Sequence, residues 1–309
     1  MKQLNKYKIL SFLILFFVTD LIIAQQDAQY TQYMYNMSVV NPAYAGSKEA
    51  VSIGFLGREQ WAGVSGAPRT ITGFIHSPIG NDLGLGMSII SDKVGPVSET
   101  SVYADLSYTI NTSYENKLAF GLKAGFTFQN IGLLSLTKVN PTDPLFTENV
   151  NKTHPNIGAG LYYYSDEWYI GLSMPNIIKS RHFKRSNGII SKASENMHTF
   201  ITGGYVFELS DDFKFKPSLL SKFAYHTPLS LDISANFLFR DKFEFGLSYR
   251  WDDSVSGLVN MLVTDSFRIG YAYDHTISNL GTFNSGSHEL FLLYDFNFDT
   301  IRYKSPRFF

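Results

Sequence analysis

The chain of 309 residues has many aromatic side chains (16%), few charged ones (17%) and a formal net charge of −1. Its near-neutral charge gives no basic footprint for nucleic acid, and its aromatic content argues against intrinsic disorder. The absence of cysteine excludes disulfides, thiolate metal sites and cysteine nucleophiles. A mean hydropathy of −0.06 excludes a helical membrane protein, so a soluble all-β protein or a membrane β-barrel remains.

Residues 1–24 have the pattern of a secretory signal peptide. Three lysines form a basic start, an apolar run follows over residues 9–18, and Ala24 precedes a polar stretch. Asp20 interrupts the apolar run, and a charge in a membrane helix costs about 2.5–3.5 kcal/mol. This favours cleavage after Ala24 over the alternative of a retained anchor.

Residues 25–49 precede the first predicted strand and contain a tyrosine-rich run (QDAQYTQYMYN, 26–36) and the block VNPAYAG (40–46). The proline restricts Asn41 to an extended or turn conformation, and Gly46 can adopt a positive φ angle. We expect a segment that lies on the periplasmic side of a barrel or plugs its lumen. Candidates for packing in such a plug, or for contact with a partner, are Tyr33, Tyr35, Asn41, Pro42 and Tyr44.

From residue 50 onward, apolar and polar side chains alternate with a period of two, which is typical of β-strands. In the segment 242–251, for example, Phe243 and Leu247 alternate with Glu244 and Ser248. The pattern predicts fourteen strands, near 50–56, 69–77, 83–91, 100–110, 116–128, 157–164, 168–174, 198–208, 213–223, 229–238, 242–251, 256–263, 267–275 and 288–298.

The predicted connections alternate between tight turns and longer loops. The longest are expected at 57–68, 131–156, 175–197 and 276–287, with shorter ones at 92–99, 224–228 and 252–255 on the same side. Outer-membrane barrels have this asymmetry, with short periplasmic turns and long extracellular loops. An even strand number also returns both ends of the barrel to the periplasm.

The two faces of the strands distinguish a membrane barrel from a soluble one. A membrane barrel directs its large apolar side chains to lipid and keeps a polar lumen, and fourteen strands enclose a space too wide for side chains alone to fill. Charged residues such as Lys123, Glu244 and Arg268 fall on the face opposite the large apolar residues. We therefore predict an all-β fold, an antiparallel transmembrane β-barrel of the outer-membrane type over 50–298, with a tail at 299–309. A soluble β-architecture is the alternative.

Two predicted loops carry candidate contact residues. The block GREQWAGVSGAPRT (57–70) places Arg58, Gln60 and Trp61 in the first extracellular loop, either folded into the barrel mouth or docking a partner. The loop 175–197 is basic, and it either contacts lipopolysaccharide phosphates or an acidic partner, or is simply solvated.

Together the blocks QDAQYTQYMYN, VNPAYAG and GREQWAGVSGAPRT resemble the PorP/SprF family of the bacterial type IX secretion system. The resemblance is sharp over residues 25–78 and weaker toward the closing SPRFF. It implies an integral outer-membrane barrel without enzymatic activity. It also implies partners: type IX components and a specific exported protein with a C-terminal sorting domain, such as a gliding adhesin.

No motif for catalysis, metal binding or cofactor binding was found, and we expect no cofactor. A hydrolase site assembled from distant strands is a rival, with Asp274, His275 and Ser278 as its best candidates. Other rivals are a porin or hydrophobic-solute transporter and a scaffold for the motility or envelope apparatus. The favoured hypothesis is an outer-membrane accessory that binds one exported protein and contacts lipid and lipopolysaccharide, but no nucleic acid.

Overall fold

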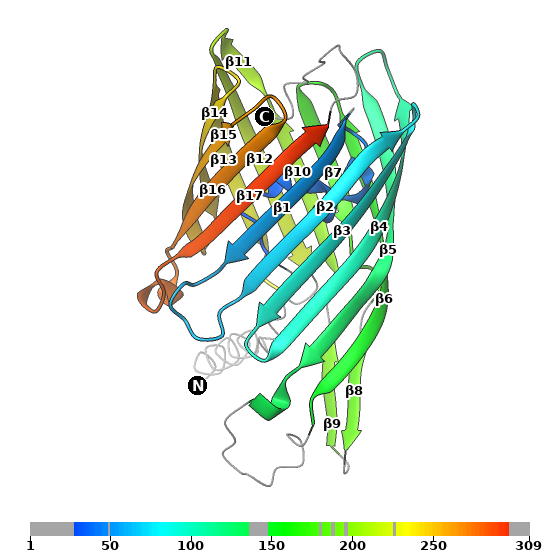
Figure 1. Cartoon of the computed structure of the whole chain (residues 1–309), viewed down its shortest axis with the longest axis vertical. Helices are drawn as coiled ribbons and strands as arrows, with labels where there is room; N and C mark the ends of the chain where they lie inside the picture. The colour runs from blue at the N-terminus through cyan, green and yellow to red at the C-terminus, as the bar shows by residue number, and fades with distance from the viewer. Residues whose placement is uncertain are drawn as a thin grey trace, which may run out of the picture.

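The computed structural model describes residues 28–48, 50–135, 148–178, 181–186, 189–194, 197–224 and 227–296. The predicted signal peptide and C-terminal tail lie outside these residues. Fourteen antiparallel strands close into one barrel, because β1 pairs with β17 and β10 pairs with both β7 and β12 (Figure 1). No described helix is both long and apolar enough to cross a membrane.

The barrel strands, in chain order, are β1 (Val51–Glu59), β2 (Arg69–Ile79), β3 (Leu83–Val94), β4 (Val97–Asn111), β5 (Lys117–Ile131), β6 (Val150–Tyr164), β7 (Trp168–Met174), β10 (His198–Tyr205), β12 (Phe213–Ala224), β13 (Ser230–Phe239), β14 (Phe243–Arg250), β15 (Ser254–Leu262), β16 (Phe267–Thr276) and β17 (Ser287–Phe296). Each overlaps one of the fourteen predicted segments. β11 (Phe207–Ser210) pairs only with β12, beyond the point where β10 ends.

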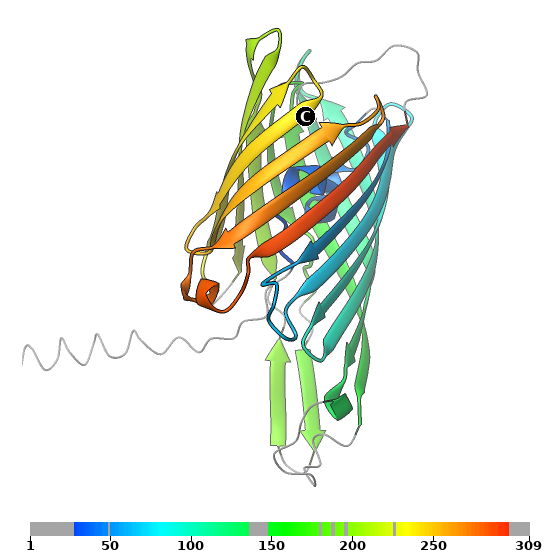
Figure 2. The same cartoon turned by 60° about the vertical axis from the view of Figure 1, so that its left-hand side comes forward.

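The structure corrects two predicted connections. Residues 95 and 96 alone join β3 to β4, where a loop over 92–99 was expected, and Gly95 supplies the positive φ angle that this tight turn needs. β6 starts at Val150 rather than near 157, so β4, β5 and β6 are the longest strands. The expected 175–197 loop contains a separate hairpin, β8 (Arg181–Ser186) and β9 (Ile189–Ser194), which hangs away from the barrel (Figure 2).

The two ends of the barrel differ in the length of their connections. The short-turn end carries the turns 80–82, 112–116, 165–167, 211–212, 240–242 and 263–266, and β1 starts there. The long-loop end carries the connections 60–68, 132–149, 175–197 and 277–286 together with three shorter ones. In Figure 1 the short-turn end is at the top.

The outer surface is apolar and the inner surface polar, as the alternation predicts. On β14, Phe245 and Leu247 are 54% and 67% exposed, whereas Glu244 and Ser248 on either side of them are buried. Aromatic rings form a girdle on the outer face at the short-turn end, with contacts between Tyr205 and Phe207, Phe213 and Phe239, Phe267 and Tyr294, and Tyr294 and Phe296. Such a girdle is typical of the boundary between lipid and water.

Candidate functional site

The N-terminal segment over residues 28–48, hereafter the plug, lies inside the barrel (Figure 1). It contains three short helices, η1 (Tyr33–Tyr35), α2 (Met37–Val40) and η2 (Pro42–Tyr44). From Tyr30 to Ala45 every residue is buried. A wet fourteen-stranded lumen cannot be filled by strand side chains alone, so this segment supplies the missing core.

The NPAY part of the plug (residues 41–44) packs against glycines on the inner face of β5 and β6. Asn41 caps η2 by accepting a hydrogen bond from the Ala43 backbone N–H at 3.0 Å, and its side-chain amide donates to the Leu161 carbonyl at 2.9 Å. A Cβ atom at Gly121 or Gly160 would clash with the backbone of Ala43 or the side chain of Asn41. The small residues on the inner face of β5 and β6 therefore allow the plug backbone to approach the wall.

The C-terminal end of the plug is fixed at the short-turn end of the barrel. Ser107 donates a hydrogen bond to the Ala45 carbonyl at 2.5 Å, and Gly46, with a φ angle of 73°, donates from its backbone to His76 at 3.4 Å. Lys48 forms an ion pair of 2.8 Å with Asp295. These contacts direct the chain into β1.

The N-terminal end of the plug is held by a buried charged group, the Arg58 cluster (Arg58, Thr31, Asp274 and Glu289). The Arg58 guanidinium lies 2.6 Å from Asp274 and 3.1 Å from Glu289, and all three side chains are at most 2% exposed. Glu289 accepts the backbone N–H groups of Thr31 and Gln32 at 2.9 and 2.7 Å. Because a buried charge is costly unless it is paired, these contacts fix the plug to the wall.

A second charged group holds the middle of the plug. The Tyr35 hydroxyl donates to Glu244 and accepts from Arg268 at 3.2 Å, while Arg268 and Glu244 pair at 3.1 Å. The Tyr35 ring stacks on Phe291 with centroids 4.3 Å apart.

The connections β1–β2 and β16–β17, hereafter the mouth loops (residues 60–68 and 277–286), are joined to each other at the long-loop end. The Ala62 backbone N–H donates to the Gly286 carbonyl at 2.8 Å, and the Ser285 backbone N–H donates to the Ala62 carbonyl at 2.9 Å. The backbone N–H of Trp61 donates to the Ser287 hydroxyl at 3.2 Å. Phe283 is 76% exposed at the tip of the second loop.

The structure separates the predicted contact residues into two groups. Gln60 and Trp61 lie in the first mouth loop and are partly exposed. The other six are buried within the barrel: Arg58, Tyr33, Tyr35, Asn41, Pro42 and Tyr44. The placement of Arg58 in the loop was wrong, because it belongs to β1 and its side chain points into the lumen. Partner contact stays a prediction; of the predicted residues, only Gln60 and Trp61 are partly exposed.

Glu289, Thr31 and the glycines of β5 and β6 were not identified from the sequence. The available signal was positional: Glu289 and Asp274 occupy inward positions of strands whose outward positions are apolar.

The basic residues of the 175–197 loop, from Lys179 to Lys192, have side chains outside the described part of the structure.

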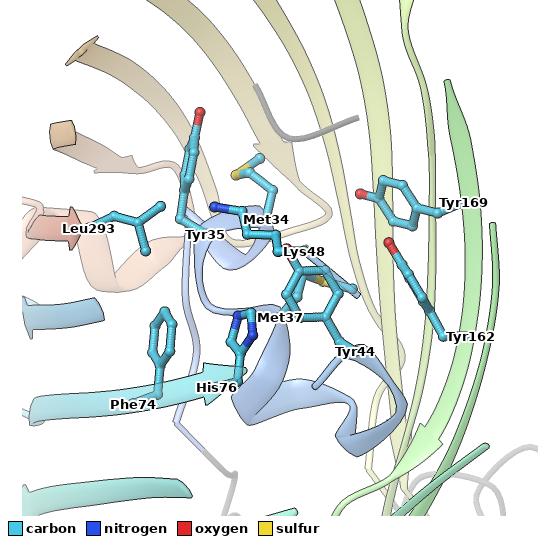
Figure 3. Close-up of a pocket in the computed structure, with 10 residues that line it drawn as sticks. All are labelled: Met34, Tyr35, Met37, Tyr44, Lys48, Phe74, His76, Tyr162, Tyr169 and Leu293. Carbon is cyan, nitrogen blue, oxygen red and sulfur yellow. The ribbon is translucent and has the colours of Figure 1, made fainter. Parts of the chain in front are cut away.

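One small cavity lies between the plug and the wall (Figure 3). Met34, Met37 and Tyr44 line it from the plug, and Phe74, His76, Tyr162 and Tyr169 line it from the barrel. The space open to the centre of a water molecule is only about 20 Å³. This volume holds about one water molecule, so the cavity does not form a passage for a solute.

The hydrolase candidates do not come together. Asp274 is buried beside Arg58, whereas His275, the next residue of the same strand, is exposed on the outer face. Successive side chains of a strand point to opposite faces, which prevents this pair from acting together. Within the described residues, no group of three or more His, Asp or Glu side chains is placed to hold a metal ion.

Comparison with solved structures identifies the fold. The CymD monoaromatic hydrocarbon channel matches with a TM-score of 0.51 and 11% identity, over 87% of this chain and 93% of that chain. A Pseudomonas aeruginosa FadL homologue (TM-score 0.48, 11% identity, 84% and 94% covered) and the Pseudomonas putida toluene transporter TodX (0.47, 8%, 85% and 94%) are also similar. At 11% identity the match to CymD shows an outer-membrane barrel fold and nothing about solutes.

Comparison by sequence identifies the family. Curated proteins give no match. The family described as "Type IX secretion system membrane protein PorP/SprF" matches residues 22–294, which is most of the chain and includes the plug and all of the barrel except the last two residues of β17. Together with the barrel fold, this match makes the chain an outer-membrane member of the PorP/SprF family of type IX secretion.

Proposed function

We propose that this barrel binds one specific exported protein through its long-loop end and supports its export or surface anchoring. The proposed partner carries a C-terminal sorting domain recognised by type IX secretion, and a gliding adhesin is one such protein. In this proposal the short-turn end faces the periplasm and the long-loop end faces the exterior, as in other outer-membrane barrels.

The observation that supports a binding role is the filled lumen beneath ordered mouth loops. The plug is buried from Tyr30 to Ala45 and bonded at both ends, which weighs against an open porin. The mouth loops are tied to each other and to β17 by hydrogen bonds, and they present Trp61 and Phe283. Aromatic side chains on an ordered surface are typical anchors of protein interfaces.

The test is genetic. Deletion of the gene should leave one type IX cargo in the cell or the medium while the others reach the surface normally, as measured by mass spectrometry of surface-shaved cells. Restoration with the Trp61→Ala variant should recover the barrel in the outer membrane but less of that cargo on the surface. Tyr114→Ala, at an exposed aromatic position in a short turn at the opposite end of the barrel, is the matched control and should restore cargo fully.

If all cargo proteins reach the surface in the deletion strain, the accessory function is wrong. If Trp61→Ala and Tyr114→Ala restore equally, the accessory function stands but Trp61 of the first mouth loop does not contact the cargo. Co-purification of the tagged barrel in detergent should also recover the same cargo.

A further inference from the structure

The plug has a direction, which follows from the strand positions that it contacts. Thr31 and Gln32 donate to Glu289, near the start of β17, and the Tyr30 hydroxyl lies 3.0 Å from that of Thr72, near the start of β2. Both strands start at the long-loop end. The first residues of the plug are therefore at that end of the lumen.

The last residues of the plug contact the opposite end. Lys48 pairs with Asp295, the residue before the end of β17. Glu289 and Asp295 lie six positions apart on one strand, which corresponds to about 20 Å at roughly 3.3 Å per residue. The plug thus runs through the lumen from the long-loop end to the short-turn end and then enters β1.

The start of the plug cannot fold back to the short-turn end. Residues 28–31 span at most about 10 Å even when fully extended, because each residue contributes no more than about 3.6 Å. Between them and the short-turn end, the lumen is occupied by residues Tyr33 to Ala45, which are themselves buried. Ala28 and Gln29 are instead only partly buried.

We infer that Ala28 and Gln29 are accessible from the cell exterior and form one docking surface with the mouth loops. This rests on the orientation in the proposed function and extends it. The Arg58 side chain links the two parts, since it donates to the Thr31 hydroxyl at 2.9 Å and is three residues before Trp61. A sorting domain that approaches the mouth from outside meets the start of the plug beside Trp61.

The chain contains no cysteine, so single cysteines can report accessibility. Gln29→Cys is the test variant. Ser65→Cys marks an exposed site of the mouth loops, Ser113→Cys marks an exposed short turn, and Ser38→Cys marks the buried middle of the plug. Each variant is treated with a membrane-impermeant maleimide in intact cells and again after the outer membrane is permeabilised, and labelling is measured by mass shift.

The expected result is labelling of Gln29→Cys and Ser65→Cys in intact cells, with Ser113→Cys labelled only after permeabilisation and Ser38→Cys protected throughout. If Ser65→Cys and Ser113→Cys behave as expected but Gln29→Cys is labelled only after permeabilisation or only in denaturant, the inference is overturned and the orientation survives. If Ser113→Cys is labelled in intact cells and Ser65→Cys is not, the orientation itself is wrong.

Discussion

The guanidinium of Arg58 on β1 lies 2.6 Å from the carboxylate of Asp274 on β16, although β17 separates the two strands in the barrel wall. Both side chains reach across the inner face and meet over the Glu289 side chain of β17. Thr31 of the plug completes the group by donating its hydroxyl to Asp274 at 2.7 Å. Three adjacent wall strands and the plug are thus connected through one buried arginine.

Arg58→Ala should destabilise the barrel strongly. Removal of one partner from a buried ion pair typically costs about 3–5 kcal/mol, because the buried carboxyl groups of Asp274 and Glu289 would lose their cationic partner. Urea unfolding of the protein in phospholipid vesicles, followed by tryptophan fluorescence, measures the free energy. Arg69→Ala is the control, because it breaks the exposed pair with Glu59 and should cost less than about 1 kcal/mol. Equal effects of the two substitutions would contradict a structural role for the cluster.

Gly121→Ala should loosen the plug, because the added methyl group overlaps the backbone of Ala43. Overpacking costs about 1–3 kcal/mol, which raises the population of the displaced plug roughly 5- to 150-fold. The measurement is the rate of maleimide labelling of Ser38→Cys in detergent-solubilised protein.

The matched control for this substitution is Gly257→Ala, where a Cβ meets no atom within 4 Å. It should leave the labelling rate of Ser38→Cys unchanged. An unchanged rate in Gly121→Ala as well would show that the plug does not depend on close approach to β5.

The intact protein should pass no steady current in a planar bilayer, since the plug fills the lumen between its two anchored ends. A variant without residues 28–46 should conduct, provided that it migrates as a folded barrel in unheated gel electrophoresis. A stable conductance of the intact chain, equal to that of the shortened one, would instead favour the transporter alternative.

Leu247→Arg should destabilise the protein in vesicles by about 2–4 kcal/mol, the cost of a cation on the lipid face near the middle of a membrane barrel. Leu247 is 67% exposed on the outer face of β14. Tyr114→Arg is the control, since Tyr114 is fully exposed in a short turn outside the barrel wall and should change stability little. The same urea unfolding measurement distinguishes lipid contact from a soluble outer surface, on which both changes would be mild.

The sequence alone was sufficient to predict the strands and the use of their two faces. Alternation is a local property: Phe245 and Leu247 are placed outward relative to Glu244 and Ser248 by the geometry of any extended chain. Hydrocarbon outside and polar groups inside then follow from which face is apolar. The blocks around Asn41 and Trp61 likewise carried the family resemblance, which the family match confirms.

Only the tertiary structure decided which inward residues meet. Arg58 and Asp274 are 216 positions apart, and Asn41 reaches the Leu161 carbonyl across 120 positions. Such contacts depend on strand register, tilt and closure of the whole ring, which no local pattern encodes. For this reason the strand pattern was enough to predict the barrel wall. The position of the plug, its direction and the burial of Arg58 depend on the closed barrel and are known only from the tertiary structure.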